Sequence, residues 1–311
     1  MVALSDYLKI TRPLNLLIVA LLQCMMYYGV LLPVLEEYGL DSVFKGGLFP
    51  VFILVTVIIA ASGNVINDLV DVEIDRINKP SKWIVGNIIP LRRVVYFYIV
   101  LIIIGWILSL YIAYKIDKFY YLFLYVLAVI FLFIYSNKLK KVLLLGNLLV
   151  SIFTAGVIGI ILVFEYDSGL LLKSISDESY NYIRNVFFGF MFFSFMTSLY
   201  REIVKDIEDM QGDKIEGAKT MPLVFGEKAS KIISLIIAVM ILIALVFWTR
   251  MDINMDKDCF VLYTYILVIP FLLFTVFILL KSKIKTDFGN LSKLIKIFML
   301  LGIVMLVFYF V

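Results

Sequence analysis

Long apolar segments dominate this chain and restrict what it can fold into. A helix needs about 20 apolar residues to cross the hydrocarbon core of a bilayer, and the sequence contains nine segments of roughly that length. Apolar and polar residues do not alternate strictly within them, so the pattern favours helices over the strands of a transmembrane barrel. The predicted spans are residues 13–35, 48–66, 92–114, 119–135, 142–164, 185–202, 230–249, 260–280 and 294–311.

The overall composition agrees with this reading. Of the 311 residues, 63% are hydrophobic and 17% are charged, which is far more apolar than a typical soluble domain. The segments between the spans are short. We therefore predict an all-α, polytopic integral membrane protein in which residues 1–311 form a single membrane-embedded domain of about nine helices around a central cavity.

The distribution of Lys and Arg predicts the orientation in the membrane. With nine spans, the N-terminal segment and every second loop lie on one face, and most of the 28 Lys and Arg residues fall there. Positive residues concentrate on the cytoplasmic side, so we expect the N-terminus inside and the C-terminus outside in the plasma membrane. The net charge of +4 is spread over short segments and indicates no nucleic-acid partner. No obligate protein partner is evident either.

The absence of histidine limits the possible chemistry. It excludes imidazole as a general base or metal ligand, and with it Ser–His and Cys–His catalysis. The two cysteines, Cys24 and Cys259, lie in or beside apolar spans. We interpret them as small apolar residues, not as a disulfide framework or thiolate metal site.

Two acidic clusters with the same spacing follow the second and sixth spans. Each has the pattern Asp-x2-Asp-x3-Asp, and the predicted orientation puts both on the cytoplasmic face. Spacings of three and four residues bring helical side chains to one face, so each cluster is predicted to form a column of carboxylates. The first cluster comprises Asp68, Asp71 and Asp75, and the second comprises Asp206, Asp209 and Asp213.

Such columns predict a divalent cation. Neighbouring carboxylates repel one another, and Mg²⁺ commonly binds one or two carboxylates together with substrate phosphates. We expect Asp68 to act as a second ligand or an orienting group, and Asp206 to be a third ligand beside the pair Asp209 and Asp213. Acidic residues at a helix end are usually solvated loop charges, but two matching clusters on one face argue against that alternative. The predicted metal ligands are Asn67, Asp71, Asp75, Asp209 and Asp213.

The flanking residues resemble the signatures of the UbiA family of intramembrane prenyltransferases. The first cluster continues as Arg76-Ile77-Asn78-Lys79-Pro80, and the second is followed by Gly217-Ala218-Lys219-Thr220-Met221-Pro222. Arg12-Pro13-Leu14-Asn15 is similar to an early Arg-Pro-x-Asn element of the family, and Tyr135-Ser136-x-Lys138 resembles a position where a tyrosine faces the reacting carbon. The nine spans, with signatures after spans two and six, match the family layout over the whole chain.

The resemblance implies a Mg²⁺-dependent transferase. It would move a polyprenyl group from its diphosphate to a lipophilic acceptor by ionisation of the allylic diphosphate. The implied catalytic residues are the six aspartates and Tyr135, whose ring would stabilise a developing cation. The alternative roles stay open: topology determinants for the lysines, an interfacial position for Arg12 and Tyr135. The implied substrate-binding residues are Arg12, Asn15, Asn67, Lys79, Lys138, Lys141, Arg201 and Lys205.

Within the family, two stretches point to one branch. Arg201-Glu202-Ile203-Val204-Lys205-Asp206 and Glu73-Ile74-Asp75 most resemble the branch that makes digeranylgeranylglyceryl phosphate. This implies a geranylgeranyl donor and a glycerol-phosphate ether lipid as acceptor. Residues 81–85 depart from that branch's usual run, so an aromatic acceptor of quinone biosynthesis remains an alternative. A transporter with acidic gates is an alternative of another class, although transporter sites usually lie near the membrane midplane.

Overall fold

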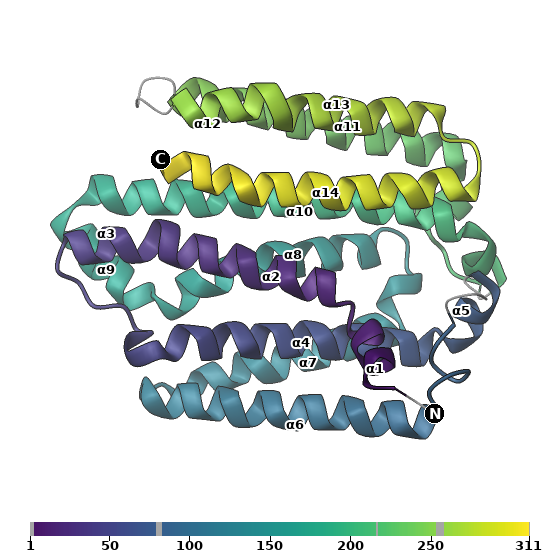
Figure 1. The fold of residues 1–311 in the computed structure, drawn as a ribbon, viewed down its shortest axis with the longest axis horizontal. Coiled ribbons are helices and arrows are strands. Elements are labelled where there is room, and N and C mark those ends of the chain that lie inside the picture. Colours follow the sequence, from purple (N-terminus) through teal and green to yellow (C-terminus); the bar gives the residue numbers. More distant parts are fainter. Residues whose placement is uncertain (1–2, 79–82, 216, 253–257, 311) are drawn as a thin grey trace.

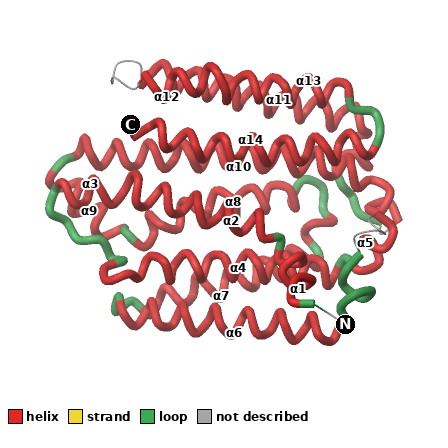
Figure 2. The backbone as a smooth tube through the Cα atoms, in the orientation of Figure 1, coloured by secondary structure: helices red, strands yellow, loops and turns green. Residues whose placement is uncertain are grey.

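The computed structural model describes residues 3–78, 83–215, 217–252 and 258–310, and these residues are almost entirely helical (Figure 2). Within them there is no β-strand, only an isolated bridge between Val85 and Ile89. A π-helical segment, η1 (Met25–Leu31), joins α2 to α3, and η7 (Thr264–Val268) joins α12 to α13. The α-helices are α1 (Leu4–Thr11), α2 (Pro13–Cys24), α3 (Leu32–Glu37), α4 (Leu48–Val70), α5 (Val72–Asn78), α6 (Leu91–Lys115), α7 (Leu122–Asn137), α8 (Leu145–Phe164), α9 (Tyr166–Ile175), α10 (Asp177–Ile215), α11 (Met221–Asp252), α12 (Asp258–Tyr263), α13 (Ile269–Lys281) and α14 (Lys285–Phe310). The short 3-10 turns are η2 (Lys45–Gly47), η4 (Phe119–Tyr121) and η5 (Leu139–Lys141).

Eight helical segments of the described chain are long and apolar enough to cross a bilayer, and they coincide with eight of the nine predicted spans. The remaining predicted span, 185–202, lies within α10. That helix is more polar than the others, because Ser194, Thr197 and Ser198 interrupt its apolar run. α10 nevertheless runs the length of the bundle beside α14 (Figure 1). The predicted all-α, polytopic membrane architecture is confirmed.

Two groups of helices pack around α2 and α8. α10 packs against α8, α11 and α14, whereas α4 packs against α6 and α7. α2 contacts both α4 and α8, so it bridges the two groups. In Figure 1, α1 and α5 lie at one end of the bundle, and α3, α9 and the C-terminus lie toward the opposite end. This arrangement brings the ends of α4 and α10 that carry the acidic clusters to the same end of the molecule.

The first acidic cluster departs from the straight helix that its spacing predicts. α4 ends at Val70 and α5 begins at Val72, with Asp71 between them at φ −89° and ψ 13°. The N–H of Asp71 still donates to the carbonyl of Asn67 at 2.9 Å, and the N–H of Asp75 donates to that of Asp71 at 2.8 Å. The carboxylate column is therefore bent at its middle residue. The second cluster lies inside α10, as predicted.

Arg12 marks the break between α1 and α2. Its backbone is left-handed, with φ 57° and ψ 65°, a conformation that non-glycine residues rarely adopt. Pro13 follows as the first residue of α2, where the missing N–H of proline costs no helical hydrogen bond. The break directs the Arg12 guanidinium to the carboxylate of Asp68 on α4.

A close approach between α10 and α14 yields a test of this packing. A Cβ added at Gly302 on α14 would overlap the ring of Phe193 on α10, which is itself buried and lies 5.5 Å from Phe298 between ring centroids. Small residues at such crossings let membrane helices pack closely. We expect Gly302→Ala to destabilise the protein by about 1–3 kcal/mol, the usual cost of overpacking, and to lower the Tm of the purified protein in detergent.

Gly156 in α8 provides the matched control, because a Cβ there meets no atom within 4 Å. Gly156→Ala should keep or raise the Tm, since alanine favours the helix over glycine. Equal Tm values for the two variants would show that the α10–α14 crossing accommodates the added methyl group without strain.

Candidate active site

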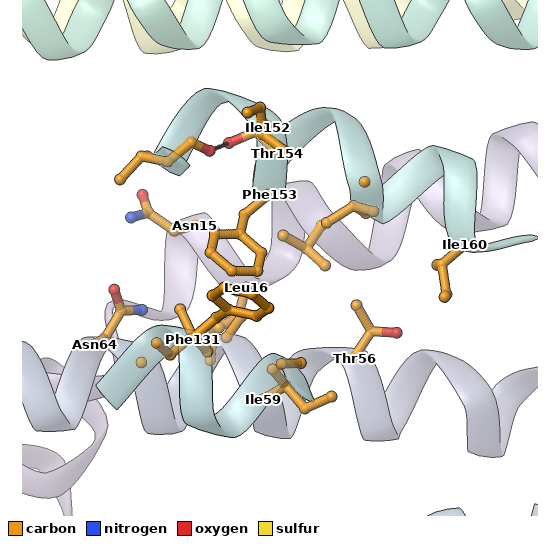
Figure 3. Close-up of a pocket in the computed structure, with 18 of the residues that line it drawn as sticks. Asn15, Leu16, Thr56, Ile59, Asn64, Phe131, Ile152, Phe153, Thr154 and Ile160 are labelled. Carbon is orange, nitrogen blue, oxygen red and sulfur yellow. Dashed lines mark hydrogen bonds between the residues drawn. The ribbon is translucent and has the colours of Figure 1, made fainter. Parts of the chain in front are cut away.

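An apolar cavity of about 560 Å³ runs through the bundle. Its walls come mainly from α2, α4, α6, α7 and α8, with residues of α10 and α14 at one end. Figure 3 shows Phe131 of α7 and Phe153 of α8 on this wall, with Asn15 and Asn64 toward one end and Ile160 toward the other. A volume of this size is typical of a site for a single small ligand.

A smaller polar cavity of about 100 Å³ adjoins the polar end of the apolar one. Both acidic clusters line it: Asn67, Asp71 and Asp75 on one side, and Asp206, Asp209 and Asp213 on the other. The two cavities meet, because five residues line both of them. These shared residues are Arg12, Asn67, Tyr135, Glu202 and Lys205.

Neighbouring side chains hold the first cluster in place. The Ser136 hydroxyl donates to Oδ1 of Asn67 at 2.6 Å, and the Lys140 ammonium pairs with the Asp71 carboxylate. Asp68 is not among the residues that line the polar cavity. It accepts a hydrogen bond from Arg12 at 2.7 Å instead, so in this structure it orients the guanidinium.

Burial strongly affects the second cluster. The Asn147 amide donates to Oδ2 of Asp206 at 2.9 Å. Burial nevertheless raises the pKa of Asp206 to about 7, with nearby Glu202 adding to the effect. Burial and the charge of Asp209 raise the pKa of Asp213 to about 6, and Asp71 of the first cluster contributes as well. The clusters thus interact electrostatically across the polar cavity.

A cationic group lies at the polar end of the apolar cavity. Arg12, Arg201, Lys205 and Lys296 all line that end, together with the single carboxylate of Glu202. Glu202 pairs with Arg201 at 2.6 Å, and its other oxygen lies 3.8 Å from the Lys205 ammonium. Three helical regions supply this group: the α1–α2 junction, α10 and α14.

The structure brings together most of the site residues predicted from the sequence. Tyr135 lies where the two cavities meet, Lys141 lines the polar cavity, and Asn15 lines the apolar one. Lys138 is exposed at the end of α7 and lines neither cavity. Lys79 lies outside the described residues.

Four residues of the site are absent from the sequence prediction: Lys140, Asn147, Glu202 and Lys296. Lys140 lies within a group of three basic residues, Glu202 lies in the stretch that resembles one branch of the family but has no predicted role there, and Asn147 belongs to no motif. A charge inside an apolar helix usually indicates function, and Lys296 fits that signal. Lys296 falls at the edge of the last predicted span, which begins at residue 294, whereas α14 begins at Lys285 and includes Lys296 well within the helix.

The donor atoms of the polar cavity suit a hard divalent cation. Within the described residues, no group of three or more His, Cys, Asp or Glu converges closely enough to hold a metal unaided. Mg²⁺ needs fewer protein ligands than that, because it takes one or two carboxylates and completes its octahedron with water and substrate phosphates. The raised pKa values of Asp206 and Asp213 show that the protein's own cations do not offset the burial of these carboxylates. A bound cation would therefore be favoured here.

Known proteins resemble the chain over nearly its full length. The model of the UbiA prenyltransferase family matches residues 35–302. The digeranylgeranylglyceryl phosphate synthase of Methanosphaera stadtmanae is 31% identical over 305 residues, which cover 97% of each chain. The enzyme of that name from Methanocaldococcus jannaschii is 31% identical over 256 residues, covering 80% of this chain and 79% of the relative.

Solved structures share the fold. A structure described as that of a digeranylgeranylglyceryl phosphate synthase in membranes superposes with a TM-score of 0.60 at 27% identity and covers 98% of both chains. A UbiA homologue from Archaeoglobus fulgidus, bound to DMAPP and Mg²⁺, has a TM-score of 0.56 at 16% identity and covers 97% of this chain and 99% of its own. Together with the match of the family model, these similarities show that the chain belongs to the UbiA family of membrane-embedded prenyltransferases.

Proposed function

We propose that this protein transfers a geranylgeranyl group from geranylgeranyl diphosphate to a glycerol-phosphate ether lipid. One observation supports this above all: both acidic clusters line a polar cavity that joins a long apolar cavity at Tyr135 and Asn67. Such a site accommodates a diphosphate among the carboxylates and a prenyl chain among the apolar side chains. The relatives described as digeranylgeranylglyceryl phosphate synthases support the choice of donor and acceptor.

In the proposed reaction, the bond between C1 of the prenyl chain and the diphosphate oxygen breaks, and the acceptor hydroxyl oxygen bonds to C1 and releases its proton. Mg²⁺ bound between the carboxylates and the diphosphate would neutralise the charge of the leaving group. Asn67, Asp71 and Asp75 on one side of the cavity, and Asp209 and Asp213 on the other, would supply the protein ligands, with one or two carboxylates for each ion. We assign Asp206 an assisting role in the second cluster.

Other side chains would bind the diphosphate and stabilise the charge that develops at the reacting carbon. Lys140 and Lys141 line the polar cavity, where their ammonium groups would contact the diphosphate oxygens. Tyr135 lies at the junction of the cavities, where its ring would face C1 and stabilise positive charge developing there. Asp68 would keep Arg12 directed toward the site through their 2.7 Å hydrogen bond.

We further propose that the protein lies in the plasma membrane with its catalytic end facing the cytoplasm. The N-terminus would then be inside the cell and the C-terminus outside. The concentration of Lys and Arg in the segments at that end supports this orientation. The chain would act as a single domain, and the reaction as proposed requires no protein partner.

Activity should depend on Mg²⁺, because carboxylates alone repel a diphosphate. We expect chelation to abolish prenyl transfer and excess Mg²⁺ to restore it. A nonreactive geranylgeranyl thiodiphosphate together with Mg²⁺ should raise the Tm more than either ligand alone, since ligands that bind the native state stabilise it in proportion to occupancy. KCl at equal ionic strength is the control. Full transfer in metal-free buffer would contradict the proposal.

Single carboxylates in the two clusters should be essential. We expect Asp71→Ala and Asp209→Ala each to lower kcat/KM by at least about 100-fold, or about 2.7 kcal/mol of transition-state stabilisation. Asp177, which is exposed at the opposite end of α10 from Asp209, provides the matched control, and Asp177→Ala should leave the rate unchanged. Similar rates for the three variants would place the chemistry elsewhere.

The charge at the polar end of the apolar cavity favours a phosphorylated acceptor over an aromatic one. Four cationic side chains line this end against the single carboxylate of Glu202. A phosphate monoester carries about −1.5 to −2 charges at neutral pH, so it would pair with more of these cations than an aromatic acid, which supplies one negative charge. Arg201 and Lys296 are therefore our candidates for acceptor binding.

Lys296 provides the sharpest test of the acceptor. Losing one charge-assisted hydrogen bond to phosphate weakens binding by about 1.5–3 kcal/mol, so Lys296→Ala should raise KM for a glycerol-phosphate lipid by about 10-fold to 100-fold. The KM for the prenyl diphosphate should change less, and Lys296→Arg should preserve acceptor binding. Lys214 is exposed on α10 and lines neither cavity, so Lys214→Ala is the control.

The competing acceptor predicts a different result. If the wild-type protein prenylates an aromatic acid and ignores glycerol-phosphate lipids, the aromatic alternative is correct. Mass spectrometry of lipids extracted after incubation with both acceptors distinguishes the two.

A further inference from the structure

We propose that a cluster of aromatic rings closes the far end of the apolar cavity and limits the donor chain to about four isoprene units. This inference rests on the proposed function, because it assigns the apolar cavity to the prenyl chain of the donor. It adds a length-determining role for residues far from the reacting groups. We call this cluster the aromatic floor and define it as Phe44, Phe52, Tyr121 and Phe164.

The rings of the aromatic floor pack closely on one another. Phe164 is central: its ring centroid lies 4.2 Å from that of Tyr121, 5.0 Å from that of Phe52 and 5.6 Å from that of Phe44. Phe44 and Phe52 also contact each other, at 4.8 Å between centroids. All four side chains are buried, and Phe52, Tyr121 and Phe164 line the cavity.

The floor is also anchored to the backbone. The Tyr121 hydroxyl donates a hydrogen bond to the carbonyl of Val163 at 3.0 Å, so η4 is tied to the last turn of α8 directly beside Phe164. Four separate segments supply the rings: the loop before η2, α4, η4 and α8. A chain that extended past this point would have to separate all of them.

The length of the cavity matches one prenyl chain. Along α4 its lining extends from Asn67 at the polar end to Phe52 at the floor, which is about 22 Å at a rise of about 1.5 Å per residue. On α8 the lining extends from Val150 to Phe164, about 21 Å by the same measure. Two helices on different walls therefore give the same depth.

A geranylgeranyl group fits this depth and the next longer homologue does not. Taking about 1.2 Å per bond, as in an extended polypeptide, its main chain of 16 carbons spans about 18 Å, and the bonds to the diphosphate add about 2 Å. The main chain of a C25 donor spans about 23 Å before that addition, so its last unit would meet the floor. A C15 chain, about 13 Å long, would leave the far third of the cavity unfilled.

The side wall of the cavity suggests an alternative path for the prenyl chain. Phe131 and Ile152 line the cavity yet are 44% and 55% exposed, so the wall is thin there and faces the bilayer. A chain that left through this wall would never reach the aromatic floor. Transfer would then be insensitive to chain length.

Two substitutions should move the length preference in opposite directions. Ala113 is buried and lines the cavity on α6, and its carbonyl accepts a hydrogen bond from the N–H of Lys118 in the turn that leads to Tyr121. Ala113→Leu should shorten the cavity, and Tyr121→Leu should deepen it. Ala244, on α11 and outside both cavities, gives the matched control Ala244→Leu.

The experiment offers each variant an equimolar mixture of C15, C20 and C25 diphosphates and quantifies the products by mass spectrometry. We expect the wild-type protein and Ala244→Leu to prefer the C20 donor over both others. Ala113→Leu should raise the ratio of C15 to C20 product by at least about tenfold, and Tyr121→Leu should raise the ratio of C25 to C20 product by a similar factor. Because each ratio is internal to one sample, reduced folding of a variant does not alter it.

Equal use of C20 and C25 donors by the wild-type protein would by itself contradict a length limit set by the aromatic floor. It would favour exit of the prenyl chain through the side wall. Unchanged product ratios in Ala113→Leu and Tyr121→Leu would contradict that length limit as well. These results differ from failure of the proposed function, in which the wild-type protein consumes no prenyl diphosphate of any length.

Discussion

Charge that is removed from water must be compensated nearby, and this constraint organises the polar end of the bundle. Six aspartates of two motifs lie at this end of an otherwise apolar protein. Two of them pair with cations, Asp68 with Arg12 and Asp71 with Lys140, and Asp206 accepts a hydrogen bond from the neutral amide of Asn147. The compensation is incomplete, because the pKa values of Asp206 and Asp213 remain raised. The site is thus prepared for additional positive charge brought with the substrate.

α10 carries both cationic and acidic residues of the site. Within little more than three turns it carries Arg201 and Lys205, which face the apolar cavity, and Asp206, Asp209 and Asp213, which line the polar one. Its packing against α8, α11 and α14 holds this sequence of charges at a fixed depth. Cationic and anionic binding regions are therefore set relative to each other by one rigid helix, while α4 and α5 supply the opposing carboxylates.

The sequence predicts the fold well, because bilayer thickness dictates span length and leaves few alternatives to helices. It also predicts both acidic clusters, since spacing along a helix determines which side chains share a face. It does not predict the bend at Asp71, the single residue that separates the end of α4 from the start of α5. Nor does it identify Lys140 or Lys296, because their place in the site depends on how α7, η5 and α14 pack against distant helices.

The apolar cavity has a consequence for the fate of the product. At about 560 Å³ it is a space for one hydrocarbon chain, yet the proposed product carries two. The acceptor's own chain must then lie outside, among the lipids, throughout the reaction. The product would never be wholly enclosed, and it could leave by sliding sideways without crossing water. Because the two cavities meet at one end of the bundle, the head group of the newly made lipid would lie in a single leaflet, and supplying the other leaflet would require a separate flipping step.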